Sequence, residues 1–335
     1  MRTKQIDILN IGLLLFSFIL ALKLPFDLFI FSYVILGPLH YLTELNWLKK
    51  NDYFVNSKKW IWVSIFLSLL ITIPLFLKLP IITNYGGHLI NDFFKFLNHF
   101  FSEIILIMFL FSIGLVYFTK WQYILLSLLI SIVFGFIIIK YVPFSFIIAG
   151  LFLPSIIHVY FFTLLFMIFG ALNTKSKEGV IAVVLLTLCP ILLSIIPIIP
   201  SDYIVSAYTE TSYATSRFSI LNSYIAKILS PLEKFYLLSE IGIKIQIFIA
   251  FCYTYHYLNW FSKTSIIGWS KSLSKGNIFI VVLLWSLSIL LYFYDFRIGY
   301  TVLFFFSIIH VVLEFPLNIA TIKGIASKIK FRLTT

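Results

Sequence analysis

Long runs of apolar residues, separated by short polar segments, make up most of this chain. Ten of them are long enough to be helices that cross the hydrocarbon core of a bilayer, which needs about 20 residues. The predicted helices lie near residues 6–22, 28–48, 60–79, 102–119, 122–140, 146–172, 179–198, 245–262, 277–294 and 300–321. Two segments break the pattern. Residues 84–101 interleave polar and aromatic side chains and predict an interfacial segment, and residues 201–234 predict a long polar loop with an amphipathic helix.

The composition supports this interpretation. Of 335 residues, 61% are hydrophobic and only 11% are charged, which is far from the mixture found in soluble domains. We therefore expect an all-α, polytopic integral membrane helical bundle of about ten transmembrane helices, organised as a single transmembrane domain over residues 1–335. No small-residue cleavage site follows the first apolar run before Lys23, so this run is expected to be an uncleaved helix.

The distribution of charge predicts the orientation of the helices. With the N-terminus in the cytoplasm, 16 of the 25 lysine and arginine residues fall on the cytoplasmic side, and most acidic residues fall on the other side. Both termini are then cytoplasmic, most simply in a cytoplasmic (inner) membrane. The formal charge of +12 is explained by this asymmetry and by attraction to anionic headgroups of the lipid bilayer. No basic and aromatic motif indicates a nucleic-acid partner, and the oligomeric state is not determined by the sequence.

Four histidines share one depth in predicted helices that run in the same direction. They are His40, His158, His256 and His310. Counted at a rise of about 1.5 Å per residue, each lies near the middle of its helix or slightly to the cytoplasmic side. Glu44 follows His40 and Glu314 follows His310 at i+4, a spacing that places each glutamate on the same helix face as its histidine. Ionisable residues at this depth cost about 2.5–3.5 kcal/mol on insertion scales and usually face a partner or a cavity.

This group of side chains predicts a metal site. Imidazole suits iron, zinc, copper and nickel, and a carboxylate adds charge compensation. We predict that the four histidines bind one metal ion, and that Glu44 and Glu314 act at the same site as ligands or as acceptors of a ring N–H. Asn259, Tyr255 and His88 are weaker candidates for the groups around it. The simpler alternative is that each histidine forms an interhelical hydrogen bond, worth about 0.6 kcal/mol on average.

Two segments resemble a known enzyme family. The stretch GPLHYLTE (37–44) resembles the GxxHxxxD pattern of the Brp/Blh-type membrane β-carotene dioxygenases, with Glu44 in place of the aspartate, and IAFCYTYHYLNW (249–260) is similar to their aromatic, histidine-bearing helix. The resemblance implies a multi-helix protein in which histidine-bound iron cleaves a carotenoid. It also implies that His40 and His256 are motif histidines, with His158 and His310, or His88, completing the set. The family carries a second histidine where this chain has Trp260.

Several functions follow from these features. The first is a membrane-embedded metalloenzyme, with non-haem iron preferred and zinc or copper as alternatives, that uses oxygen to modify a lipid-soluble small molecule such as a carotenoid. The second is an ion- or proton-coupled transporter that uses buried histidine and glutamate. Haem ligation by two of the histidines, and a membrane glycosyl or acyl transferase that uses the 201–234 loop, are further alternatives.

Overall fold

The protein is a bundle of α-helices in the computed structural model, which describes residues 3–76, 79, 88–216, 218–232, 234–263, 268, 270 and 273–334. Within these ranges no β-strand occurs. The chain packs as two compact units, each assembled from separate stretches of sequence. Unit 1 contains Met1–His40 and Val159–Arg297, and unit 2 contains Tyr41–His158 and Ile298–Thr335. The single transmembrane domain expected from the sequence stays a prediction.

Unit 1 contains the first helices of the chain and most of its second half. Its elements are α1 (Thr3–Lys23), α2 (Pro25–Phe31), the π-helix Ser32–Leu36, the start of α3 (Gly37–Lys50), α10 (Thr163–Thr174), α11 (Lys177–Ile195), a 3-10 turn at Pro200–Asp202, α12 (Ala207–Thr215), α13 (Phe218–Leu229), α14 (Glu240–Ser262) and α16 (Lys275–Tyr294). The predicted 201–234 loop therefore contains two helices, α12 and α13.

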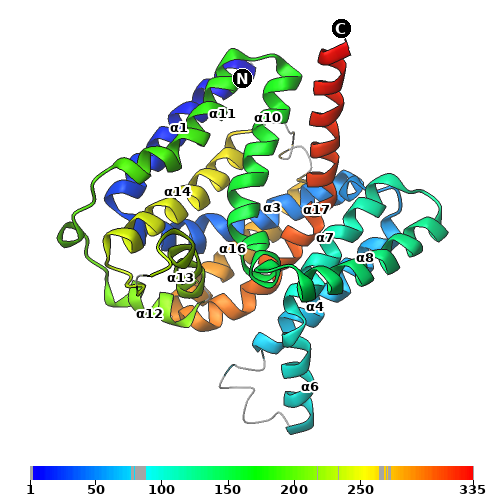
Figure 1. Ribbon diagram of the computed structural model, residues 1–335, viewed down its shortest axis with the longest axis horizontal. Helices are drawn as coiled ribbons and strands as arrows, with labels where there is room; N and C mark the ends of the chain where they lie inside the picture. Colours follow the sequence, from blue (N-terminus) through cyan, green and yellow to red (C-terminus); the bar gives the residue numbers. More distant parts are fainter. Residues whose placement is uncertain are drawn as a thin grey trace. The chain divides into compact units, whose positions relative to one another are not determined.

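Helix α14 is the centre of unit 1. It packs against α1, α2, α11 and α13, and Figure 1 shows α1, α11 and α14 running side by side. Its buried polar side chains form hydrogen bonds with these neighbours. Gln246 accepts a hydrogen bond from the Asn222 side chain (3.1 Å) and donates one to the backbone carbonyl of Pro25 (3.1 Å). A helix covered on most sides can carry polar residues, because its partners satisfy them.

Unit 2 contains the remainder of α3, two 3-10 turns at Asp52–Phe54 and Lys58–Trp60, α4 (Ile61–Phe76), α6 (His88–His99), α7 (Phe101–Tyr117), α8 (Trp121–Tyr141), α9 (Ser145–Ile147), most of a long π-helix (Ile148–Phe162) and most of α17 (Phe296–Thr334). Helices α7 and α8 form a hairpin that is visible in Figure 1. Two glycines allow their close approach, since a Cβ at Gly114 would overlap the Ser127 side chain and one at Gly135 would lie 2.6 Å from Ile107. A core of Leu48, Ile61, Ile309 and Leu313 joins α3, α4 and α17.

Eight helical segments in the described part of the chain are long and apolar enough to cross a membrane. They are Lys4–Lys23, Pro25–Lys50, Lys58–Phe76, Trp121–Tyr141, Ser145–Thr174, Lys177–Ile195, Lys275–Tyr294 and Phe296–Lys330. Each corresponds to one of the helices expected from the sequence, and the expected helices 60–79 and 179–198 both continue past the ends of these segments, at Phe76 and Ile195. The expected span 102–119 is the shorter apolar helix Phe101–Tyr117, and the expected span 245–262 lies within α14, which begins earlier, at Glu240. The all-α membrane bundle is thus confirmed.

Candidate metal centre

All four membrane histidines are buried, and each unit brings two of them together. His40 and His256 belong to unit 1, whereas His158 and His310 belong to unit 2. Of these, His40, His158 and His310 each offer a buried ring nitrogen as a metal ligand. The two pairs are described separately below, and the prediction that all four bind one ion stays a prediction.

An irregular helix positions His40. Pro38 has no backbone N–H, so it removes one ordinary i→i−4 hydrogen bond from this turn. The preceding residues form the π-helix Ser32–Leu36, in which the backbone N–H of Gly37 bonds to the carbonyl of Ser32. A hydrogen bond of 2.7 Å between the hydroxyls of Ser32 and Thr254 ties this π-helix to α14. Such widened turns occur often at functional sites.

In unit 1, the Nε2 atoms of His40 and His256 are 3.0 Å apart. The Oγ1 atom of Thr163 lies 2.7 Å from Nδ1 of His256 and holds that ring from its other side. The rings of Tyr257 and Trp260 pack on His40 with centroid distances of 5.1 and 5.5 Å. Trp260 therefore forms one wall beside the unit 1 pair.

In unit 2, the Nε2 atoms of His158 and His310 are 3.2 Å apart. His158 lies in the π-helix Ile148–Phe162, which contains Pro154. The Oε2 atom of Glu314 is 3.3 Å from Nδ1 of His158. Nδ1 of His310 is 3.3 Å from the backbone carbonyl of Phe306, one turn earlier in α17.

Two carboxyl groups meet beside the unit 2 pair. Glu44 and Glu314 are 2% and 1% exposed, and their side chains interact with each other. Asn318, one turn after Glu314, also contacts the Glu314 carboxyl group. Two adjacent carboxyl groups in a buried site are stabilised by a nearby cation or by sharing a proton. Glu314 shares a helix face with His310, as predicted from their spacing, and it also lies against His158.

The centroid distances between the paired rings can be compared with those expected for two rings that bind one ion. A ring nitrogen lies about 1.15 Å from the ring centre and about 2.0–2.1 Å from a bound metal. Two rings that bind one ion at the observed Nε2···Nε2 distances should therefore have centroids about 4.7 Å apart for His40 and His256, and about 5.0 Å apart for His158 and His310. Two rings pointing straight at each other should have centroids about 5.3 and 5.5 Å apart. The centroid distances are 4.6 Å in unit 1 and 5.0 Å in unit 2. Both pairs therefore have inclined rings that would suit a shared ion, and each Nε2···Nε2 contact also has the geometry of a direct hydrogen bond.

The cation or hydrogen bond between the unit 2 rings depends on which ring nitrogens carry protons. A carbonyl oxygen only accepts, so the contact with Phe306 requires the proton of His310 to lie on Nδ1. The Glu314 carboxylate beside Nδ1 of His158 favours a proton there as well. Two neutral rings in this form present two Nε2 lone pairs to each other. A metal ion or one additional proton would stabilise that arrangement, whereas a proton on Nε2 of either ring gives a direct hydrogen bond.

The weaker candidates occupy other places. Tyr255 is buried, its hydroxyl donates to the sulfur of Met167 (3.4 Å), and its ring stacks on Phe251. Asn259 is buried, and its backbone carbonyl accepts from the hydroxyl of Ser262 (2.8 Å). His88 is the first residue of α6, and its side chain lies outside the described part of the chain.

Two side chains at the pairs were not among the predicted site residues. Thr163 has no motif that would identify it, since only the fold brings it to His256. Asn318 could have been found, because His310, Glu314 and Asn318 follow one another at i, i+4 and i+8 on one face of a helix.

Comparisons with known proteins give no match: no family model, no curated protein and no solved structure is similar to this chain.

Proposed function

We propose that this chain is a membrane-embedded metalloenzyme whose four buried histidines bind a transition metal, with non-haem iron as the preferred ion. The observation that carries the proposal is the convergence of the imidazole rings within each pair, at Nε2 separations of 3.0 and 3.2 Å. The carboxylate next to His158 supports it, because metal-binding histidines usually donate their second N–H to such a group.

The proposed donor set fits iron. Two or more imidazoles with one or two carboxylates, leaving open coordination positions, form the type of site that non-haem Fe(II) oxygenases use. Such an ion, when bound, would supply oxygen activation. The roles of the chain's own residues are then separate: Glu314 and Thr163 orient the rings of His158 and His256, and the apolar helices around them exclude water.

The surroundings of the histidines favour a lipid-soluble substrate. The aromatic rings of Tyr257 and Trp260 pack on His40, and Tyr41 packs on His310 with a centroid distance of 5.7 Å. Aromatic faces and apolar helices accept a hydrocarbon, whereas a charged substrate would lose its hydration without compensation. A long polyene or isoprenoid lipid, of which a carotenoid is one instance, is the substrate class that we propose.

The proposal is tested by metal analysis of the purified protein. We expect the wild type to retain iron, or zinc or copper, in a stoichiometric amount, and His158→Ala and His40→Ala each to lose bound metal. His99→Ala is the matched control, since His99 is an exposed residue of α6 and should retain the wild-type content. A wild type that binds none of these ions after supplementation, or two variants with unchanged metal content, would overturn the proposal.

A second function has its own supporting observation. In unit 2, Glu44, Glu314, His158 and His310 form a continuous series of neighbouring ionisable groups. Chains of glutamate and histidine inside membranes serve as proton relays in pumps and transporters. An ion- or proton-coupled transporter would use an additional proton, not a metal ion, as the cation of the pair. Proton uptake by metal-free protein in proteoliposomes, lost in Glu314→Gln, would favour it.

We also propose that both termini face the cytoplasm, because this orientation gives the cytoplasmic side most of the lysine and arginine residues. Reporter fusions at each end would test it, and a reporter active only outside the cytoplasm at either end would contradict it.

A further inference from the structure

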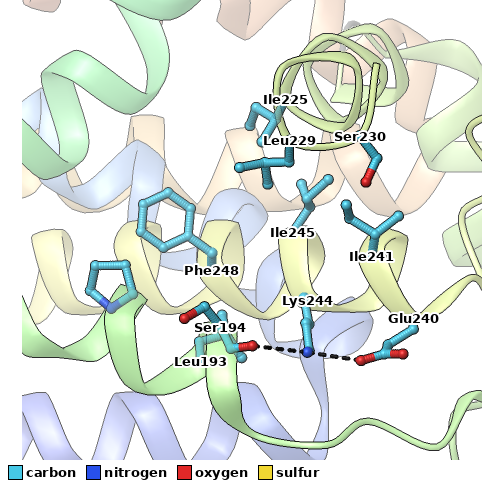
Figure 2. A pocket seen from close by; sticks show the side chains of 11 residues that line it. Leu193, Ser194, Ile225, Leu229, Ser230, Glu240, Ile241, Lys244, Ile245 and Phe248 are labelled. Atoms are coloured by element: carbon cyan, nitrogen blue, oxygen red, sulfur yellow. Dashed lines mark hydrogen bonds and ion pairs between the residues drawn. The ribbon is translucent and has the colours of Figure 1, made fainter. Parts of the chain in front are cut away.

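A cavity of about 600 Å³ lies in unit 1 between α11, α13 and α14, apart from the histidine pair (Figure 2). Its size falls within the range of about 300–1,000 Å³ that small-molecule sites occupy. Apolar side chains form its walls. They are Leu193 of α11, Ile225 and Leu229 of α13, and Ile241, Ile245 and Phe248 of α14.

The cavity has a polar end and an apolar end. Glu240 is the first residue of α14 and Ser194 is close to the last residue of α11, so both lie where helices end. Phe248 lies eight residues further along α14, about 12 Å away at 1.5 Å per residue. In Figure 2, the Lys244 and Glu240 side chains are on one side of the cavity, and Ile225 and Leu229 lie opposite Phe248 and Ile245. A ligand with a polar head and one hydrocarbon chain would match these two ends.

The polar end carries one positive and one negative group that are bound to each other. Nζ of Lys244 is 2.8 Å from Oε1 of Glu240 and donates to the backbone carbonyl of Ser194 at 3.2 Å. The Lys244 side chain is 21% exposed, so it is largely enclosed, whereas Glu240 is 56% exposed. Within the described part of the chain, these two acceptors use two of the three N–H groups of the ammonium. The pair has no net charge and offers both a donor and an acceptor.

We propose that this cavity binds an uncharged lipid whose polar head carries a hydroxyl group, such as a monoacylglycerol or a long-chain alcohol. A hydroxyl both donates and accepts, so it can bond to Lys244 and to Glu240 at once. An anionic head would meet the Glu240 carboxylate, and a cationic head would meet the Lys244 ammonium. The proposal concerns a site separate from the histidines and does not depend on metal binding.

Equilibrium binding of radiolabelled probes to the full-length protein in phosphatidylcholine nanodiscs tests this site. The probes are 1-monooleoylglycerol, oleate and oleylamine, which share a C18 chain and differ in head charge. We expect saturable binding of one 1-monooleoylglycerol per chain, at least tenfold tighter than that of either charged probe. Equal binding of all three, or binding that does not saturate, would show bulk lipid only and would overturn the proposal.

Charge variants give a result that loss of folding does not produce, because each should raise the affinity for one of the charged probes. Glu240→Gln leaves a net positive end and should raise the affinity for oleate about tenfold or more. Lys244→Met leaves a net negative end and should raise the affinity for oleylamine while weakening 1-monooleoylglycerol binding. A misfolded protein would not gain affinity for a probe, so variants that fail to shift toward the opposite charge contradict the assignment.

Matched controls use the same substitutions outside the cavity. Glu210→Gln in α12 and Lys227→Met in α13 remove an exposed charge of the same kind and should leave the order of the three probes unchanged. Ile245→Trp should fill the cavity and abolish saturable binding of all three probes. If Glu210→Gln changed oleate affinity as much as Glu240→Gln does, the effect would be one of general surface charge and the proposal would fail.

Discussion

Replacing Glu314 by glutamine should weaken metal binding by a defined amount. The amide keeps the size of the side chain, but it removes the carboxylate that lies 3.3 Å from Nδ1 of His158. Substitution of the group that orients a metal-binding histidine usually costs about 10- to 100-fold in affinity. At about 1.4 kcal/mol per factor of ten, this is about 1.4–2.8 kcal/mol. If Glu314 were itself bound to the ion, the loss would be much larger.

The same substitution should have the opposite effect on the metal-free protein. Without an ion, Glu44 and Glu314 place two interacting carboxyl groups in a buried site, and removing one of them relieves that conflict. Glu314→Gln should therefore raise the melting temperature of the metal-free protein and lower that of the metal-loaded protein. Few other effects of a buried substitution change sign with metal content.

The assay is a titration of chelator-treated protein with Zn²⁺ or Fe²⁺ in competition with a chelator of known affinity. Glu103→Gln is the control, because Glu103 is a buried carboxyl group of α7, 7% exposed, that is not part of the histidine pair. Its metal affinity should stay within about twofold of the wild type. A Glu314→Gln affinity equal to that of the wild type would refute the role assigned to Glu314.

Three further substitutions test other parts of the structure. Thr163→Val removes the hydroxyl that lies 2.7 Å from Nδ1 of His256, and metal titration should show a loss of about tenfold. Gly242→Ala should lower the melting temperature by several degrees, because a Cβ there would overlap two backbone carbonyl oxygens. Gly12→Ala is the control, since the space around Gly12 is open, and equal melting temperatures of the two variants would contradict this packing. Burial lowers the pKa of Lys263 from 10.5 to about 8. Between pH 8 and 10.5 the unfolded chain therefore binds more protons than the folded one, and the stability of the wild type should rise with pH relative to that of Lys263→Met. Melting temperatures of the two proteins that change in parallel with pH would contradict this prediction.

The sequence predicted the helices well, because apolar runs of this length have few other structures available in a membrane. It was less informative about α14. That helix carries Gln246, Thr254 and Asn259, and the polar content makes the run look shorter than the 23 residues it has. Such residues are tolerated where neighbouring helices supply partners, as Asn222 does for Gln246. The number of polar residues in a helix therefore depends on how many neighbouring helices surround it as well as on its position in the membrane.

The sequence indicated which histidines are buried, but not how they pair. Depth along each helix can be counted from the sequence, and it identified the four buried histidines correctly. Which histidine meets which depends on the order of helices in space, and the structure pairs His40 with His256 and His158 with His310. The π-helices before His40 and around His158 were indicated only indirectly, by Pro38 and Pro154. A proline predicts that one hydrogen bond is lost, but not how many following residues adopt the wider turn.

The pairing changes the chemical argument about these residues. A lone membrane histidine is satisfied by any donor or acceptor on a neighbouring helix, so its presence says little about function. Two rings whose Nε2 atoms face each other at 3.2 Å, with Nδ1 of each ring beside an oxygen atom, favour a positively charged group at the Nε2 side when Glu314 is ionised. The glutamate beside His158 then serves to balance that charge in a medium that does not solvate it. Metal content together with the sign change in Glu314→Gln stability therefore distinguishes a pair that binds a metal ion from one that binds a proton or forms a direct hydrogen bond.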